Sequence, residues 1–517
     1  MSAYYVDTAG NDGNSGLSEI LPWLTVNKVN ISSFNAGDSV SFKKTCTWRE
    51  RLVPPSNGSS GSRITFGVYG TGDLPIISGA DNITAQTWTQ VGSTNVWYTT
   101  YAADPGIVWF DGVSYPEAAS AVTVTSTARW FWSSGDTRIY VYATSSPNGF
   151  YTDIEAPNAT RSGAMANWDS KYITFENLEF RYGTPYTFYL LGDAEGCIAQ
   201  DCVMLGAGAG GAALKIKESA NNCTVQRCTI TGNDATGSGS DVVHISDDDS
   251  TTSGTTIQYC TIKNASHSVL KLLNASASII QYNRIENDSA TYGRALEVVN
   301  ALNVGGNIVR YNWIEGSYVN GVAADGNKFT GWNNELYGNV FTTGNDCGLS
   351  MPSYTDNGVL IVTIGNKVYN NVFYGFTGGP VGAPQLGCIV LDDYGLRSPA
   401  GNLIKNNIIF GNNGTNHYQV VLFASSTLAA YTLTNNCIYD AITTSTVYDG
   451  GAARTVAYME ANHAAQWSAN IVSDPAMTSP STGDFTLQAG SPCIDTGVNL
   501  GATYQMALRP GSTWPGV

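Results

Sequence analysis

A short motif recurs along most of this chain, and it restricts the possible folds more than any other feature. Each copy reads as a polar start, an apolar residue, a few mixed residues, an Asn or Cys, and a further apolar residue, as in "NNCTVQRCTI", "ASIIQYNRI" and "GNLIKNNII". Copies follow one another at 23 to 36 residues. A unit of this length cannot close a core alone and must stack on its neighbours. The Asn or Cys column runs through Asn177, Cys202, Cys228, Cys260, Asn283, Asn312, Asn339, Asn371, Asn407 and Asn436.

A second apolar segment lies between successive copies, for example "AALKIKE", "DVVHISD", "SVLKLLN" and "RALEVVN". Two or three short strands per repeat predict an all-β fold, the right-handed parallel β-helix. Asparagine suits the turn because it tolerates a left-handed backbone, and stacked asparagines can bond from coil to coil. Propeller blades need about 40 residues, and leucine-rich repeats need a fixed leucine pattern, so both fit less well.

Residues 84–160 interrupt this rhythm with alternating, aromatic-rich segments such as "ARWFWSSGDTRIYVYATS", which predict an inserted antiparallel β subdomain. We expect its aromatic side chains to fill its own core, with a sugar-binding platform as the alternative. The predicted domains are a cap with the first coils (1–83), the insertion (84–160), the main β-helix (161–445) and a closing coil with a tail (446–517).

The chain resembles the pectate-lyase-like β-helix superfamily. The opening "YYVDTAGNDGNSGLSEILPWLTV" resembles the N-terminal cap of secreted and phage β-helix proteins, and "DPAMTSPSTGDFTLQAGSPCIDTG" resembles their closing coil. The resemblance covers nearly the whole chain. It is specific for the fold and weak for the activity, because one fold hosts many functions.

Charge and composition exclude several classes of function. The formal charge is −16, whereas nucleic acid requires a basic groove, so a nucleic-acid partner is not expected. No run of eighteen apolar residues exists, so no membrane span is expected. The N-terminus lacks the pattern of a signal peptide, although an extracellular or virion-associated location is expected. We expect a monomer, or a trimer if the protein is a phage spike.

Cysteine spacing follows the repeat. Cys197 and Cys223 are 26 residues apart, and so are Cys202 and Cys228. Ten cysteines could form a set of disulfides, but cysteines that recur with a structural period are typical of stacked, buried thiols.

The strands between the columns predict a row of outward side chains. Their apolar residues come in pairs two apart, such as Leu270 and Leu272, so the residue between each pair points outward. In successive coils this outward position holds Lys215, His244, Lys271, Glu297, Ala323, Ser350 and Val390. The first four are ionisable, in a chain with only 13% charged residues, and we predict that they form the functional site.

Further polar residues flank this row. Asp241, His267 and Arg294 precede it on the same strands, and Lys217, Asp325 and Asp392 lie two residues beyond it. These flanking residues are candidate substrate ligands. The alternative is a solvated surface, stabilised by cross-strand ion pairs.

This residue set favours β-elimination on an acidic, uronate-containing polysaccharide. That reaction needs a cation beside the carboxylate, a base for the adjacent C–H proton and an acid for the leaving oxygen. Lys271 or His244 is the candidate base, with Arg294 and Lys215 as carboxylate or leaving-oxygen partners. The chain resembles β-helix lyases of the chondroitinase B and alginate lyase type, which place a lysine and an arginine on adjacent coils. Arg294 departs from them because it stands at the start of its strand.

The resemblance also raises the question of calcium, because some such lyases use Ca²⁺. The acidic stretch Asp247, Asp248 and Asp249 offers the oxygen ligands that Ca²⁺ prefers, with a solvated turn as the alternative. No cofactor is required by the other residues of the predicted site.

Two other functions remain open. An inverting glycoside hydrolase could use Glu297 and Asp325, whose Cα atoms would lie roughly 8 Å apart. The polygalacturonase family, which shares the fold, carries aspartate pairs, and this chain has Asp392–Asp393 but lacks its Gly-His-Gly and Arg-x-Lys motifs. The third possibility is a glycan-binding spike or adhesin without enzymatic activity.

Overall fold

The structure is a computed structural model of the 517-residue chain. It describes residues 1–115, 117–158, 161, 163–208, 210–233, 240–287, 293–301, 303–318, 326–356, 359–377, 386–392, 399–411, 417–423 and 425–504.

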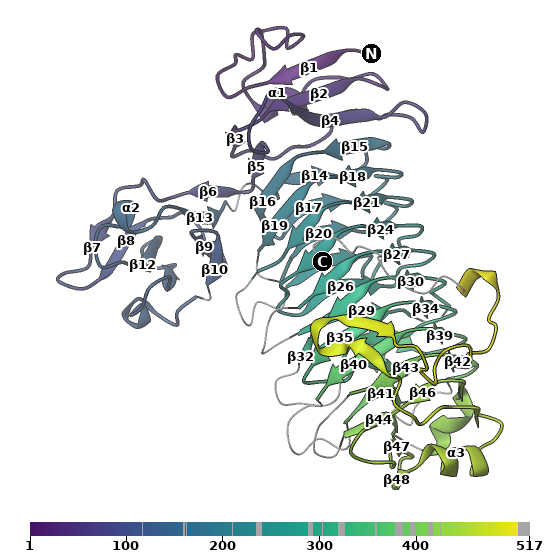
Figure 1. The fold of residues 1–517 in the computed structure, drawn as a ribbon. Coiled ribbons are helices and arrows are strands. Elements are labelled where there is room, and N and C mark those ends of the chain that lie inside the picture. Colours follow the sequence, from purple (N-terminus) through teal and green to yellow (C-terminus); the bar gives the residue numbers. More distant parts are fainter. Residues whose placement is uncertain are drawn as a thin grey trace. The chain divides into compact units, whose positions relative to one another are not determined.

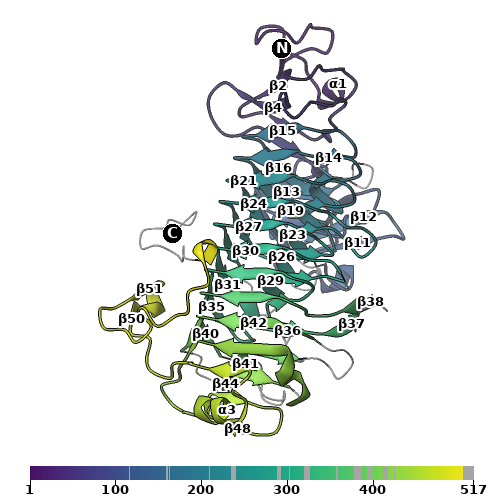
Figure 2. The same cartoon turned by 90° about the vertical axis from the view of Figure 1, so that its right-hand side faces the viewer.

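Three long parallel sheets stack as a β-helix, which confirms the predicted fold class (Figures 1 and 2). The chain divides into two compact units. The first contains residues 1–244 and 263–267, and the second contains residues 245–262 and 268–517. None of the described helices is long and apolar enough to cross a membrane.

In the first unit, each of the three sheets takes one strand from a coil. The first sheet has the order β1 (Ala3–Val6), β2 (Ser39–Lys43), β4 (Ile64–Tyr69), β15 (Ile173–Glu176), β18 (Ile198–Gln200), β21 (Thr224–Gln226). The second has β14 (Met165–Asn167), β17 (Tyr186–Leu190), β20 (Ala212–Ile216), β23 (Asp241–Ile245). The third has β3 (Thr47–Trp48), β5 (Ile76–Ser78), β16 (Glu179–Gly183), β19 (Val203–Ala207), β22 (Thr229–Thr231). A short helix, α1 (Val26–Asn30), lies near the N-terminus.

The predicted insertion is confirmed as two small antiparallel sheets within the first unit. One has the order β10 (Val113–Tyr115), β9 (Val108–Phe110), β13 (Ile154–Pro157), β6 (Ala80–Asn82). The other has β11 (Trp130–Ser133), β12 (Arg138–Tyr142), β8 (Val96–Thr100), β7 (Thr89–Gln90). The segments η1 (Ala121–Thr123) and α2 (Pro147–Phe150) connect them. Buried side chains from both sheets, among them Val108, Ile154, Trp130 and Val141, form one shared core.

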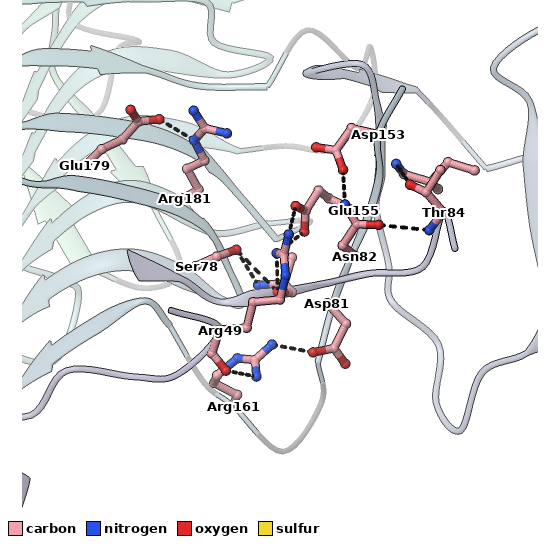
Figure 3. Close-up of polar contacts among 12 residues, drawn as sticks. Arg49, Ser78, Asp81, Asn82, Thr84, Asp153, Glu155, Arg161, Glu179 and Arg181 are labelled. Atoms are coloured by element: carbon pink, nitrogen blue, oxygen red, sulfur yellow. Dashed lines mark hydrogen bonds and ion pairs between the residues drawn. The ribbon is translucent and has the colours of Figure 1, made fainter. Parts of the chain in front are cut away.

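The insertion is joined to the coils by an aromatic contact and by ion pairs. Trp109 of β9 stacks on Tyr182 of β16, with ring centroids 4.2 Å apart. In Figure 3 the guanidinium of Arg49 faces the carboxylate of Glu155, and both of its terminal nitrogens bond to that carboxylate, at 2.7 and 2.8 Å. Arg161 pairs with Asp81 at 2.6 Å. Burial raises the pKa of Glu155 to about 7, although Arg49 acts in the opposite direction.

In the second unit the three-strand coils continue. The first sheet has the order β24 (Thr256–Gln258), β27 (Ile279–Gln281), β30 (Ile308–Arg310), β34 (Glu335–Tyr337), β39 (Lys367–Tyr369), β42 (Asn402–Lys405), β45 (Tyr431–Thr434), β49 (Trp467–Ser468). The second has β26 (Ser268–Leu273), β29 (Gly293–Val299), β33 (Lys328–Phe329), β36 (Leu349–Pro352), β41 (Leu386–Asp392), β44 (His417–Leu422), β47 (Val447–Tyr448), β48 (Ala453–Arg454). The third has β25 (Thr261–Lys263), β28 (Arg284–Glu286), β31 (Trp313–Glu315), β35 (Val340–Gly344), β40 (Val372–Phe376), β43 (Ile408–Phe410), β46 (Cys437–Ile438).

Short elements outside these sheets complete the second unit. Strand β32 (Ser317–Tyr318) pairs with β29, and the hairpins are β37 (Tyr354–Asp356) with β38 (Val359–Ile361) and β50 (Met477–Ser479) with β51 (Asp484–Leu487). The helical segments are η2 (Ser425–Ala430), α3 (Val456–Asn462), η3 (Pro480–Thr482) and η4 (Ala502–Tyr504).

The asparagines of the repeat column form a buried ladder in the second unit, as predicted. In each step the backbone N–H and the side-chain amide donate to the Oδ1 of the next asparagine, at 2.9–3.1 Å, through Asn283, Asn312, Asn339, Asn371, Asn407, Asn436 and Asn470. A second ladder, which the sequence reading missed, runs from Ser278 through Asn307, Asn334, Asn366 and Asn402.

Of the two predicted reasons for asparagine in the column, coil-to-coil bonding is confirmed and the left-handed turn is wrong. The left-handed residue is the one before the column, with φ between 53° and 60° at Asp201, Arg227, Tyr259, Tyr282, Tyr311, Asn370, Asn406 and Asn435. Asn177 is itself such a left-handed residue, and Leu178 takes the column position in its coil. The column asparagines are selected for coil-to-coil bonding of a buried amide and not for the turn.

All ten cysteines are free thiols, and eight of them are buried. Cys202 and Cys228 occupy the ladder column, and their Sγ atoms donate to backbone carbonyls of Phe175 and Ala199. The structure therefore confirms the prediction of buried thiols in place of disulfides.

Candidate functional site

The outward row of the second sheet follows the predicted register, with one correction. In the second unit, Lys271 on β26 is the Cα partner of Glu297 on β29, and Glu297 is in turn the partner of Lys328 on β33. Lys328 then pairs with Ser350, and Ser350 with Val390. The sequence predicted Ala323 at the position after Glu297, but the strand begins at Lys328, and Ala323 lies outside the described residues.

Burial shows that this row is not ordinary solvated surface. The predicted inward residues are buried, among them Leu270, Leu272, Leu296 and Val298, each 0% exposed. Glu297, which alternates with them, is only 5% exposed, although its side chain points to the opposite face of the sheet. Lys271 and Lys328 are half-buried. A carboxylate so far removed from water requires partners that hold its charge.

Glu297 has such partners on its own and the neighbouring strand. The hydroxyl of Ser268 donates to Glu297 Oε2 at 2.6 Å, and Arg294 Nη1 donates to Oε1 at 3.0 Å. Arg294 was predicted to bind the substrate carboxylate or leaving oxygen. The structure places its guanidinium against Glu297.

The surroundings of Glu297 are electropositive. Among these four described side chains, Lys271, Arg294 and Lys328 contribute three positive charges and Glu297 contributes one negative charge. Lys328 Nζ lies 5.3 Å from the ring centroid of Tyr354. Lys271 Nζ forms no hydrogen bond or ion pair with any residue that the structure describes. We refer to Lys271, Arg294, Glu297 and Lys328 as the lysine row.

A histidine cluster lies in the first unit, around Asp241. Nδ1 of His244 is 3.1 Å from Asp241 Oδ2, and Nδ1 of His267 is 2.8 Å from Oδ1. Burial alone would raise the pKa of Asp241, but hydrogen bonds from both histidines outweigh burial and hold this pKa well below its usual range. An ionised aspartate on Nδ1 fixes the orientation of each imidazole ring. His267 is the more exposed of the two, at 38% against 14% for His244.

The two predicted lysines of the first unit differ from each other. Lys215 is 1% exposed, and its Nζ lies 5.8 Å from the ring centroid of Tyr186, so it belongs to the interior of the protein and not to a solvated face. Lys217 is half-buried and forms an ion pair with Glu218 at 3.5 Å.

The remaining predicted residues are the acidic turn at Asp247, Asp248 and Asp249, and the two aspartates Asp325 and Asp392. Asp247, Asp248 and Asp249 form a turn, in which Asp248 N–H donates to Asp247 Oδ1. Among the described residues no group of His, Cys, Asp and Glu side chains could hold a metal ion. Asp325 lies outside the described residues. Asp392 ends strand β41 opposite Pro352, but its side chain lies outside the described part of the chain.

Sequence reasoning missed Ser268, Lys328 and Tyr354. Ser268 begins the same strand as Lys271, but alternation would place it on the inward face with Leu270, so only the structure reveals its contact with Glu297. Lys328 was hidden by the segment "GVAADGN", which reads as a strand and precedes the actual one.

Comparison with known proteins agrees with the fold. Residues 162–341 match the family described as "Right handed beta helix region". A lacto-N-biosidase of Bifidobacterium longum is 31% identical over 102 residues, a match that spans 18% of this chain and 6% of that protein.

Two solved structures resemble the fold over most of the chain. The complex structure of XylC with xylose has a TM-score of 0.59 and 15% identity, and covers 92% of this chain and 87% of that chain. A structure named glycoside hydrolase has a TM-score of 0.52 and 9% identity, and covers 84% and 96%. The protein is thus built on a right-handed parallel β-helix.

Proposed function

We propose that this protein is a carbohydrate-active enzyme that cleaves an acidic, uronate-containing polysaccharide by β-elimination at the lysine row. The observation that carries the proposal is the local charge. The buried carboxylate of Glu297 pairs with Arg294 and has a lysine at the register position on each neighbouring strand, in a chain whose formal net charge is −16. Such a concentration of positive charge favours an anionic ligand.

The side chains of the row match the needs of the reaction. Arg294 and Lys328 would stabilise the uronate carboxylate as negative charge develops on it. Lys271 in its amine form would accept the proton from the carbon next to the carboxylate. The electron pair of that C–H bond forms the new C=C bond, and the glycosidic C–O bond breaks. The leaving oxygen then takes a proton from the Lys328 ammonium group or from water.

Glu297 would act as a positioning residue in this scheme. Its carboxylate holds Arg294 in place. Glu297 also lies between the two lysines of the row, with Lys271 on the preceding strand of the sheet and Lys328 on the following one. The histidine cluster contains the other predicted base, His244, whose ring orientation is set by Asp241. The proposed substrate is a polymer of the extracellular environment, so an extracellular or virion-associated location remains part of the proposal.

The test is a substrate screen with a matched pair of variants. The protein is incubated with alginate, polygalacturonate, chondroitin sulfate and hyaluronan, and products are followed by the ultraviolet absorbance of unsaturated uronate and by reducing ends. Lys271→Ala should lower kcat by about 10²–10⁴, the usual contribution of a general base. Lys405→Ala is the control, because Lys405 is also a half-buried lysine on a strand of the second unit. Full activity of Lys271→Ala would refute the assigned role.

Hydrolysis is the second candidate, favoured by the partial sequence match to a lacto-N-biosidase. Glu297 would then be one of two carboxyl groups, and Asp325 its predicted partner. Reducing ends without unsaturated product, together with loss of activity in Glu297→Gln, would support this candidate against elimination. Binding of a glycan without any product would favour the non-enzymatic spike or adhesin.

A further inference from the structure

One sheet of the insertion has two aromatic faces with different surroundings. Along β11 and β12, Trp130 and Val141 point into the core of the insertion, together with Ile139. Phe131 and Tyr140 alternate with these residues and therefore point to the opposite face. Tyr98 on β8 is the Cα partner of Tyr140, so it points the same way.

The outward rings form a continuous row across three adjacent strands. Phe131 is the Cα partner of Tyr140, and their ring centroids are 6.3 Å apart. The Tyr140 and Tyr98 centroids are 5.6 Å apart. All three side chains are half-buried and lie outside the buried core of the insertion. We call Phe131, Tyr140, Tyr98 and Arg138 the aromatic platform.

A cation lies at one end of this row. The guanidinium carbon of Arg138 is 4.1 Å from the centroid of the Tyr98 ring. Asp136 Oδ2 accepts hydrogen bonds from Tyr140 Oη at 2.7 Å and from Arg138 Nη1 at 3.1 Å, which fixes both side chains. The Arg138 side chain nevertheless stays 38% exposed. Rigid aromatic rings with a polar margin are typical of binding surfaces and not of a solvated sheet.

The chemistry of the aromatic platform fits a sugar chain that carries carboxylates. A pyranose ring presents C–H groups on its face, which stack on aromatic rings, and polar groups at its edge. A guanidinium is the preferred partner of a carboxylate because it can donate two parallel hydrogen bonds. Asp136 accepts from Nη1 of Arg138, so the exposed remainder of the guanidinium would donate to a uronate stacked on the neighbouring rings.

We propose that the aromatic platform is a second binding surface for the acidic polysaccharide, distinct from the lysine row. The identity of the ligand rests on the proposed function. The aromatic platform would hold the polymer while the lysine row cleaves it, so it would contribute to KM for long chains.

The experiment is affinity gel electrophoresis in gels that contain polygalacturonate, alginate or, as a neutral polymer, xylan. The proteins are the wild type, Lys271→Ala, the double variant Phe131→Ala/Tyr140→Ala, Arg138→Gln and the control Tyr259→Ala. Tyr259 suits as a control because it is an aromatic side chain of the second unit, 44% exposed, that stacks on Tyr282. Arg138→Gln keeps the test decisive if the double variant does not fold, since it alters only an exposed side chain.

We expect an acidic polymer to retard the wild type, and we expect Lys271→Ala still to be retarded although it no longer cleaves the polymer. The double variant should bind about tenfold more weakly, the effect of losing a central aromatic contact. It should also show a higher KM for the polymer with kcat retained. Arg138→Gln should lose the preference for an acidic polymer over xylan, and Tyr259→Ala should behave as wild type.

Three results would overturn the proposal: no retardation of the wild type by either acidic polymer, wild-type affinity in the double variant, or an undiminished acidic preference in Arg138→Gln. Failure of the proposed function gives a different pattern. In that case Lys271→Ala keeps full activity, or no polymer is cleaved, while retardation of the wild type and its loss in the platform variants persist.

Discussion

Replacement of Asn339 by alanine tests whether the asparagine ladder stabilises the fold. Asn339 is fully buried, and its Oδ1 accepts from the backbone N–H and the amide of Asn312. Its Nδ2 donates to Val309 O, Tyr337 O and Asn371 Oδ1. Asn339→Ala therefore removes the partner of a buried N–H at Asn312 and of a carbonyl at Val309.

The expected loss follows from these two groups. A buried polar group without its partner costs about 1–3 kcal/mol, so two of them cost about 4 kcal/mol. The unfolding entropy is about 2.1 cal/mol/K per residue, or about 1.1 kcal/mol/K over 517 residues. The midpoint Tm should fall by about 4 °C if the chain unfolds as one, and by about 7 °C if the second unit, about 270 residues, unfolds alone.

Thermal unfolding followed by circular dichroism measures this shift. The control is Asn462→Ala, which removes one exposed hydrogen bond to Tyr458 O and should change stability by less than about 0.5 kcal/mol. Equal midpoints for the two variants would show that the ladder follows from the fold without stabilising it.

Two further predictions concern buried charges. The raised pKa of Glu155, about 7, means that the native state binds this proton more tightly than the unfolded chain. Its contribution of about 3 kcal/mol to stability is complete below about pH 4.5 and is lost as the pH rises through 7. Thermal unfolding of Glu155→Gln should lack this pH dependence. If the midpoints of the wild type and of Glu155→Gln change in parallel with pH, the prediction is contradicted. Arg294→Ala should lower the free energy of unfolding by about 3–5 kcal/mol, because it leaves Glu297 buried with its ion pair broken. The double variant Arg294→Ala/Glu297→Gln should recover part of this loss. If the single and the double variant unfold at the same denaturant concentration, the ion pair with Arg294 does not stabilise the buried charge of Glu297.

The fold was predictable because its rule is local and repeated. The column of Asn and Cys residues identified one ladder, and strict alternation placed Leu270 and Leu272 inside. The second ladder was missed although its residues lie five positions before those of the column, as Ser278 before Asn283 and Asn307 before Asn312, because this position was read only as the polar start of each motif.

The candidate site was predictable only in part, for two physical reasons. Alternation places Lys215 and Glu297 outward, but it does not reveal what covers the outer face, so their burial could not be foreseen. The position after Glu297 depends on the length of the preceding loop, and a shift of five residues replaces Ala323 by Lys328. The same limit applies to the insertion, whose strands carry aromatic residues on both faces. Only the observed strand pairing shows that Trp130 points into the core and Phe131 points outward.

Asn327 connects the fold to the lysine row. It is 1% exposed, its Oδ1 accepts from Leu296 N–H at 2.8 Å, and its Nδ2 donates to Gly348 O at 3.0 Å. It thus bonds to the coil before and the coil after its own, next to Glu297 and Lys328 in sequence. A slip of one residue would turn every side chain of strand β33 to the other face, so that Lys328 would point into the core. The buried amide of Asn327, which links three successive coils, therefore also fixes which charges strand β33 presents on the outer face.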